Sequence, residues 1–203
     1  MLFRSPDAAL ELGAPAAHRV GWGFISLYLL AYISTSLMFI APLLVKIGST
    51  KAEVPRQIFL GTLTQSAVVV AASLIGGKLS DRTGRRKIFV LTASIVYGAA
   101  MFVIAVASNF NGFLVGMAVG GLGFGIYVAV DLALVVDVLP DRDNAAKDLG
   151  VFNMAGALPF SIAPGIAPAI LAVGSGSYGV LYAVAGVCAI TGAVAILPVK
   201  RVR

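Results

Sequence analysis

Long uncharged apolar runs alternate with short polar segments along this chain. The runs at about residues 58–76 and 88–108 contain no charged residue. At 1.5 Å of rise per residue, each is long enough as a helix to cross the hydrocarbon core of a bilayer. The pattern predicts six membrane-spanning helices, at about residues 20–45, 57–76, 88–108, 112–138, 149–173 and 178–197. We therefore expect an all-α membrane protein.

The polar segments predict how the chain lies in the membrane. We expect a cytoplasmic N-terminal segment at residues 1–19, a six-helix transmembrane bundle at 20–198 and a basic cytoplasmic tail at 199–203. Twelve of the fifteen Lys and Arg residues lie on the side of this bundle that carries both termini. Because positive residues concentrate on the cytoplasmic side, both termini are expected there, in a plasma or inner membrane.

Composition agrees with a lipid environment. Hydrophobic residues make up 59% of the chain and charged residues 12%, against about 45–50% and about 25% in soluble domains. The net charge of +6 follows from the basic interhelical segments, so we expect no nucleic-acid partner. One cysteine, Cys188, and one histidine, His18, leave no metal-ligand cluster, no cofactor site and no catalytic constellation. The sequence therefore predicts a protein that is not an enzyme.

The most charged segment, residues 77–87, is called the basic segment below. It reads Gly-Lys-Leu-Ser-Asp-Arg-Thr-Gly-Arg-Arg-Lys and holds five of the fifteen basic residues. It lies between two uncharged runs, which predicts a cytoplasmic loop between the second and third helices.

Asp131 is an acidic residue about seven positions before the end of the fourth predicted helix. A charge at such a depth costs roughly 2.5–3.5 kcal/mol, so the residue is expected to face the protein interior. Three roles stay open: an ion pair with an arginine of the basic segment, a substrate contact, or a proton carrier. Asp137 is closer to the interface and is expected to pair with Arg82 or Arg85.

Other polar residues recur at helical spacing. The aligned sets are Tyr28, Tyr32, Thr35 and Ser36 in the first helix, Thr62, Gln65, Ser66 and Ser73 in the second, and Tyr127 with Asp131 in the fourth. Each set is consistent with ordinary interhelical hydrogen bonds or with one wall of a polar cavity.

Glycines and prolines mark two helices. Glycines four apart in the fourth helix, at Gly112, Gly116 and Gly120, allow close approach of a neighbouring backbone or bending of the helix. The fifth helix contains Pro159, Pro164 and Pro168, which predict a kink that is either structural or part of a gate.

The spacing G-x-x-x-D-R-x-G-R-R-K resembles the signature loop of the major facilitator superfamily, which lies between the second and third helices of a six-helix half. Residues 123–159 resemble the second half of such transporters, near the sugar-cation symporter-like branch. The resemblance implies half of the family fold, namely the C-terminal half. Leu132 and Phe160 stand where relatives often carry glutamine, which argues against a sugar-like substrate.

The resemblance also implies roles within the basic segment. Gly77 and Gly84 would shape the turn, and the charged residues would tie helices together at the cytoplasmic face: Asp81, Arg82, Arg85, Arg86 and Lys87. The function implied is secondary transport of a small solute by alternating access, coupled to an ion gradient. A second six-helix half, from a second copy or a separate chain, would complete the cavity. The alternative is an accessory membrane protein or remnant that transports nothing.

Overall fold

All regular structure in the described part of the chain is helical. The computed structural model describes residues 37–138 and 162–195, and the expected all-α class is confirmed there. The helices are α2 (Leu37–Lys46), α3 (Val54–Thr83), α4 (Arg86–Ala105), α5 (Phe110–Val138), the helix Ile162–Val173 and α7 (Tyr178–Ala195). Each of the six predicted helices thus has a counterpart, although the first and fifth are described only near their ends.

Three of the described helices are long and apolar enough to cross a membrane. These are α3, α4 and the Phe110–Val130 part of α5. The helices Ile162–Val173 and Tyr178–Val194 are shorter and also apolar. Length and composition therefore agree with a bundle that spans the bilayer.

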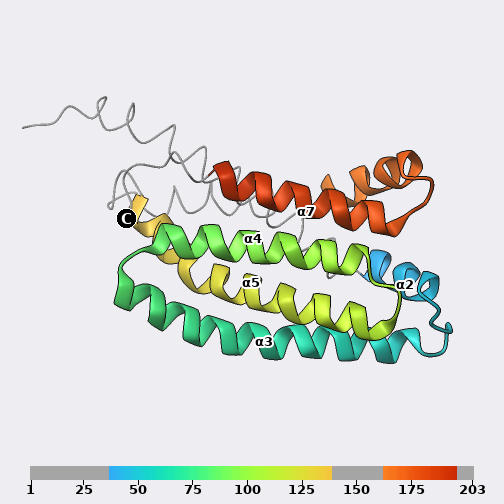
Figure 1. Ribbon diagram of the computed structural model, residues 1–203, viewed down its shortest axis with the longest axis horizontal. Coiled ribbons are helices and arrows are strands. Elements are labelled where there is room, and N and C mark those ends of the chain that lie inside the picture. The colour runs from blue at the N-terminus through green and yellow to red at the C-terminus, as the bar shows by residue number, and fades with distance from the viewer. Residues whose placement is uncertain (1–36, 139–161, 196–203) are drawn as a thin grey trace, which may run out of the picture.

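Helix α5 lies between α3 and α4 (Figure 1). Its glycines make this placement possible, because a Cβ at Gly125 would lie 2.6 Å from the carbonyl O of Val69 in α3. On the other side, a Cβ at Gly123 would lie 2.6 Å from the backbone N of Tyr97 in α4. The predicted close packing of this helix is thus present on two faces, whereas α3 and α4 barely touch each other.

Helices α3 and α5 run in the same direction. Gly61 near the start of α3 lies against Phe113, and Gly77 near its end lies against Ala129. Helix α4 returns between them in sequence and so runs the opposite way. On its far side α4 packs against α7, where Gly98 and Gly186 allow the two backbones to approach closely.

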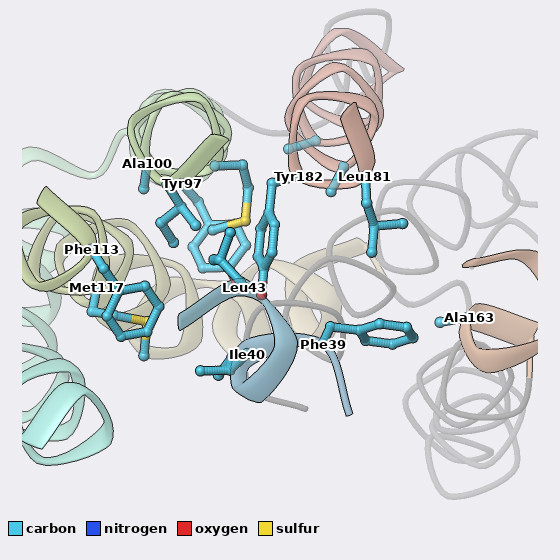
Figure 2. Close-up of a cluster of buried hydrophobic side chains, with 14 of the residues drawn as sticks. Phe39, Ile40, Leu43, Tyr97, Ala100, Phe113, Met117, Ala163, Leu181 and Tyr182 are labelled. Atoms are coloured by element: carbon cyan, nitrogen blue, oxygen red, sulfur yellow. The ribbon is translucent and has the colours of Figure 1, made fainter. Parts of the chain in front are cut away.

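The hydrophobic core is formed where α2, α4, α5 and α7 converge (Figure 2). Tyr97 of α4 and Tyr182 of α7 are fully buried there, together with Phe113 of α5. Helix α3 lies at the edge and exposes large apolar side chains, for example Phe59 at 64% and Val70 at 60%. Such a surface is suited to contact with acyl chains or with another helical body rather than with water.

The second predicted helix was expected to end near residue 76, and this boundary is wrong. Helix α3 continues through the first seven residues of the basic segment to Thr83. It ends at Gly84, which has a φ of 62° and whose N–H donates to the carbonyl of Ser80. Glycine adopts this left-handed conformation without a steric penalty, and α4 begins two residues later at Arg86.

The turns at the opposite end of the bundle are capped by side chains. The backbone N–H of Gly112 donates to Asn109 Oδ1 at 2.8 Å, and α5 begins just after Asn109. The turn between α4 and α5 therefore lies at residues 106–109, whereas the predicted helix bounds placed it at 109–111. Before α3, the backbone N–H and Oγ1 of Thr50 both donate to the Glu53 carboxylate. The turn expected at residues 174–177 is present. Lys46 Nζ, at the end of α2, donates to the carbonyl of Gly176 in this turn at 3.3 Å.

Candidate functional site

The basic segment forms the end of α3, a two-residue turn and the start of α4. Lys78 and Arg82 are one helical turn apart on α3, and Arg85 lies in the turn; all three side chains are exposed. Arg86 and Lys87 open α4 and are half-buried. The segment therefore gathers five cations at one end of the bundle, on two helix ends and the turn between them.

Asp81 is held by the segment itself. Its Oδ1 lies 3.7 Å from Arg86 Nη2, so the pair bridges the end of α3 and the start of α4. The Asp81 side chain is 72% exposed and that of Arg86 is 28% exposed. An exposed pair at this distance contributes at most about 1 kcal/mol to stability, so it orients the turn more than it stabilises the fold.

The two glycines of the basic segment have different roles from each other. Gly84 forms the turn, as the resemblance implies. Gly77 does not, because it lies inside α3, where a Cβ would make an ordinary contact at 3.7 Å with Ala129 Cβ. The expectation that Gly77 shapes the turn is therefore wrong; its neighbour Gly76 is the more constrained, with Ile126 3.0 Å from a Cβ placed there.

Asp131 and Asp137 lie in the last turns of α5, and their side chains lie outside the described residues. The backbone register nevertheless fixes the depth of Asp131. Gly123 of α5 lies against Ala93 of α4. Asp131 is eight residues after Gly123, which is about 12 Å along α5. Arg86 is seven residues before Ala93, which is about 10 Å along α4. Because the two helices run in opposite directions, both displacements point to the same end of the bundle. Asp131 and Arg86 are therefore at nearly the same level of the bundle.

The polar residues of α3 do not share a single environment. Gln65 is 7% exposed and lies where α3 meets Gly121 of α5, whereas Thr62 and Ser66 are exposed. The hydroxyls of Thr62 and Ser73 donate to carbonyls of their own helix, those of Ile58 and Val70. The expected interhelical bonds of these two hydroxyls are thus intrahelical bonds.

The remaining predicted site residues divide in two groups. Tyr127 is buried in α5 at 3% exposure, and Pro164 and Pro168 lie inside the helix Ile162–Val173, half-buried and exposed respectively. Tyr28, Tyr32, Thr35 and Pro159 lie outside the described residues. The wall of a polar cavity and the proline gate therefore stay predictions.

Sequence reasoning missed several buried polar side chains, among them Ser80 and Tyr182. Ser80 lies in the basic segment but faces inward at 2% exposure, and its Oγ has no hydrogen-bond partner among the described residues. Tyr182 is fully buried, and Figure 2 shows its ring extending from α7 towards Leu43 of α2. The signal for Ser80 was available, because it lies four residues after Gly76, on the helix face that packs against α5.

Comparison with known proteins gives the family. Residues 20–203 match the Major Facilitator Superfamily. A probable 4-methylmuconolactone transporter of Cupriavidus pinatubonensis (strain JMP 134 / LMG 1197) is 34% identical over 169 residues, which are 80% of this chain and 37% of that protein. A probable polyol transporter 4 of Arabidopsis thaliana is 31% identical over 88 residues, 43% of this chain and 16% of that protein.

A solved structure shows the same fold. The human organic anion transporter MFSD10 (TETRAN) superimposes with a TM-score of 0.61 at 20% identity, over 98% of this chain and 50% of that chain. This chain thus spans half of that transporter, and well under half of the curated relatives it matches. From the family match over most of its length, the chain belongs to the Major Facilitator Superfamily, whose members are membrane transporters and not enzymes.

Proposed function

We propose that this chain is one six-helix half of a secondary transporter, either a half-sized transporter or the C-terminal half of a longer one. It moves a small organic solute by alternating access, and an ion gradient drives the movement. The observation that carries the proposal is the likeness of 98% of this chain to one half of a solved transporter chain. In that architecture the solute site lies between two halves.

A second six-helix body is part of the proposed unit. It comes from a second copy of this chain or from a separate chain. The edge position of α3 supports this, because few of its residues are buried within the bundle. Thr62 and Ser66 are exposed on α3 beside large apolar side chains, and a second helical body would cover them from lipid.

Transport is tested with purified protein in liposomes that carry an imposed proton or sodium gradient. The solute panel follows the names of the two relatives described above: a muconolactone and a polyol. Uptake that stops when the gradient is collapsed supports the proposal, whereas uptake that persists unchanged contradicts ion coupling. If no solute enters in any assembly, including one with a co-expressed six-helix partner, the chain is an accessory protein instead.

The cytoplasmic location of the basic segment is also part of the proposal. It is supported by five cations at that end of the bundle, against Lys46, Lys51 and Arg56 at the other. In a Cys188→Ser background, cysteine at the exposed Thr83 should resist an impermeant thiol reagent in intact cells. Cysteine at the exposed Ser175 should react. Labelling of Thr83→Cys from outside would reverse the orientation.

For Asp131, the proposal is an ion pair with Arg86 at the end of the bundle. The shared level of the two residues supports this over a free proton carrier. Removing Asp131 would leave the half-buried Arg86 with one carboxylate fewer, at a cost below the roughly 3–5 kcal/mol of a fully buried pair, because Asp81 stays beside Arg86. Asp131→Ala should therefore lower thermal stability, and adding Arg86→Gln should recover part of the loss. If Asp131→Asn keeps full stability but abolishes gradient-driven uptake, Asp131 carries the proton or contacts the solute.

A further inference from the structure

The exposed surface of α3 changes character where it enters the basic segment. Leu74, Ile75 and Leu79 expose 62%, 67% and 48% of their surface. Lys78 and Arg82 lie on the same stripe of the helix, at spacings of three and four residues from these positions. From Ile75 to Arg82 the helix rises about 10 Å. The stripe therefore passes from apolar to cationic within the length of a lipid headgroup and its first methylenes.

Three exposed cations lie on this surface: Lys78, Arg82 and Arg85. The nearby carboxylate, Asp81, is engaged with Arg86 at 3.7 Å. In the described part of the chain no carboxylate lies within 4.0 Å of Lys78, Arg82 or Arg85. Below, these three cations together with Leu74, Ile75 and Leu79 are called the α3–α4 patch.

We propose that the α3–α4 patch is a binding site for one anionic phospholipid of the adjacent leaflet. Lys78, Arg82 and Arg85 contact the phosphodiester and the headgroup, while Leu74, Ile75 and Leu79 pack against the acyl chains. Lys and Arg are suited to this position because their long stems lie along apolar surface while the charge reaches the interface. A zwitterionic headgroup fits less well, since its own ammonium opposes the three cations. The proposal rests on the exposure and the charge of the residues in the α3–α4 patch, and it is independent of whether the chain transports a solute.

The test uses the full chain in detergent, with native mass spectrometry to count bound lipid at graded concentrations. The probes are phosphatidylglycerol and phosphatidylcholine of the same acyl composition. We expect the parent protein to retain phosphatidylglycerol preferentially. The preference should weaken at high salt, because screening shortens the range of the attraction from about 10 Å at 0.1 M to about 3 Å at 1 M.

Two matched double variants distinguish binding at the α3–α4 patch from an effect of the overall charge of the protein. Lys78→Gln with Arg82→Gln removes one Lys and one Arg from the patch. Lys51→Gln with Arg56→Gln removes the same two residue types from exposed positions at the other end of the bundle. At roughly fivefold per cation, the first pair should weaken phosphatidylglycerol binding roughly 30-fold, and the second pair should leave it unchanged.

Several results would overturn the proposal. Equal losses in both double variants would mean that binding follows net charge alone. Equal binding of the two lipids by the parent would exclude an anionic site. Crosslinking of Lys78 to a second copy of the chain would assign this surface to a protein partner instead. To check that the Lys78→Gln, Arg82→Gln variant is folded, its melting temperature in phosphatidylcholine is compared with that of the parent. Arg85→Gln alone is a milder variant, and it is expected to weaken phosphatidylglycerol binding several-fold.

Discussion

Gly123→Ala is the sharpest test of how α4 and α5 pack. A Cβ at this position would lie 2.6 Å from the backbone N of Tyr97 and 2.7 Å from the carbonyl O of Ala93. Backbone atoms cannot rotate away as a side chain does, so the two helices have to separate. Overpacking of this kind costs typically 1–3 kcal/mol.

Gly120→Ala is the matched control, three residues away on the same helix and also towards α4. Its Cβ would lie 3.6 Å from Ala100 Cβ, which is ordinary van der Waals contact. Both substitutions gain the same helix propensity, up to about 1 kcal/mol, so this contribution cancels in the comparison. The difference between the two variants is therefore the steric cost alone.

The assay is unfolding in mixed micelles, in which increasing denaturing detergent melts the helices and circular dichroism follows the loss. We expect Gly123→Ala to be less stable than Gly120→Ala by about 1–3 kcal/mol. Gly120→Ala should match or slightly exceed the parent. Equal stability of the two alanine variants would refute the close backbone approach between α4 and α5.

Three further changes test the turns. Ser175 has a φ of 52°, so Ser175→Gly should raise the free energy of unfolding by roughly 1 kcal/mol, and an unchanged melting curve would contradict the strained turn. The hydroxyl and the backbone N–H of Thr50 donate to the Glu53 carboxylate and hold its pKa below the ordinary value of 4.5. The ionised Glu53 therefore stabilises the folded protein. This contribution is complete above pH 4.5 and is lost as the pH falls through the lower pKa of the folded state. Acid melts of the parent should show this loss and those of Glu53→Gln should not. Asp81→Asn breaks the pair with Arg86 and should cost less than about 1 kcal/mol while raising protease cleavage at this turn; unchanged cleavage would exclude a role in holding the inner end closed.

The helices were largely predictable from sequence because hydropathy reports immersion in lipid. It does not report where a helix ends once the chain leaves the bilayer. This is why residues 77–83 were expected to form a loop, although they continue α3. The helix ends at Gly84, which adopts the left-handed conformation. A glycine at this place is a common helix C-cap signal, so this end could have been predicted from the sequence.

The site was less predictable, since helical spacing gives faces but not neighbours. Gln65 and Ser66 are adjacent in sequence and 100° apart around the helix, so one is buried against α5 and the other is exposed. Likewise, the glycine spacing predicted close packing in α5. Only the positions of α3 and α4 show that Gly123 is crowded by backbone whereas Gly120 has room for a methyl group.

The position of α5 between α3 and α4 has a consequence for how the protein is made. Helices emerge from the ribosome in order, so α3 and α4 enter the membrane as a pair that has almost no surface in common. Until α5 arrives, the small residues that it later covers on both of them, such as Ala72 and Ala93, face lipid. The third of these helices to be synthesised is thus the one that closes the first two into a folded unit. Translation arrested before residue 110 is expected to leave a hairpin open to membrane quality-control proteases, and arrest after residue 138 a protected one.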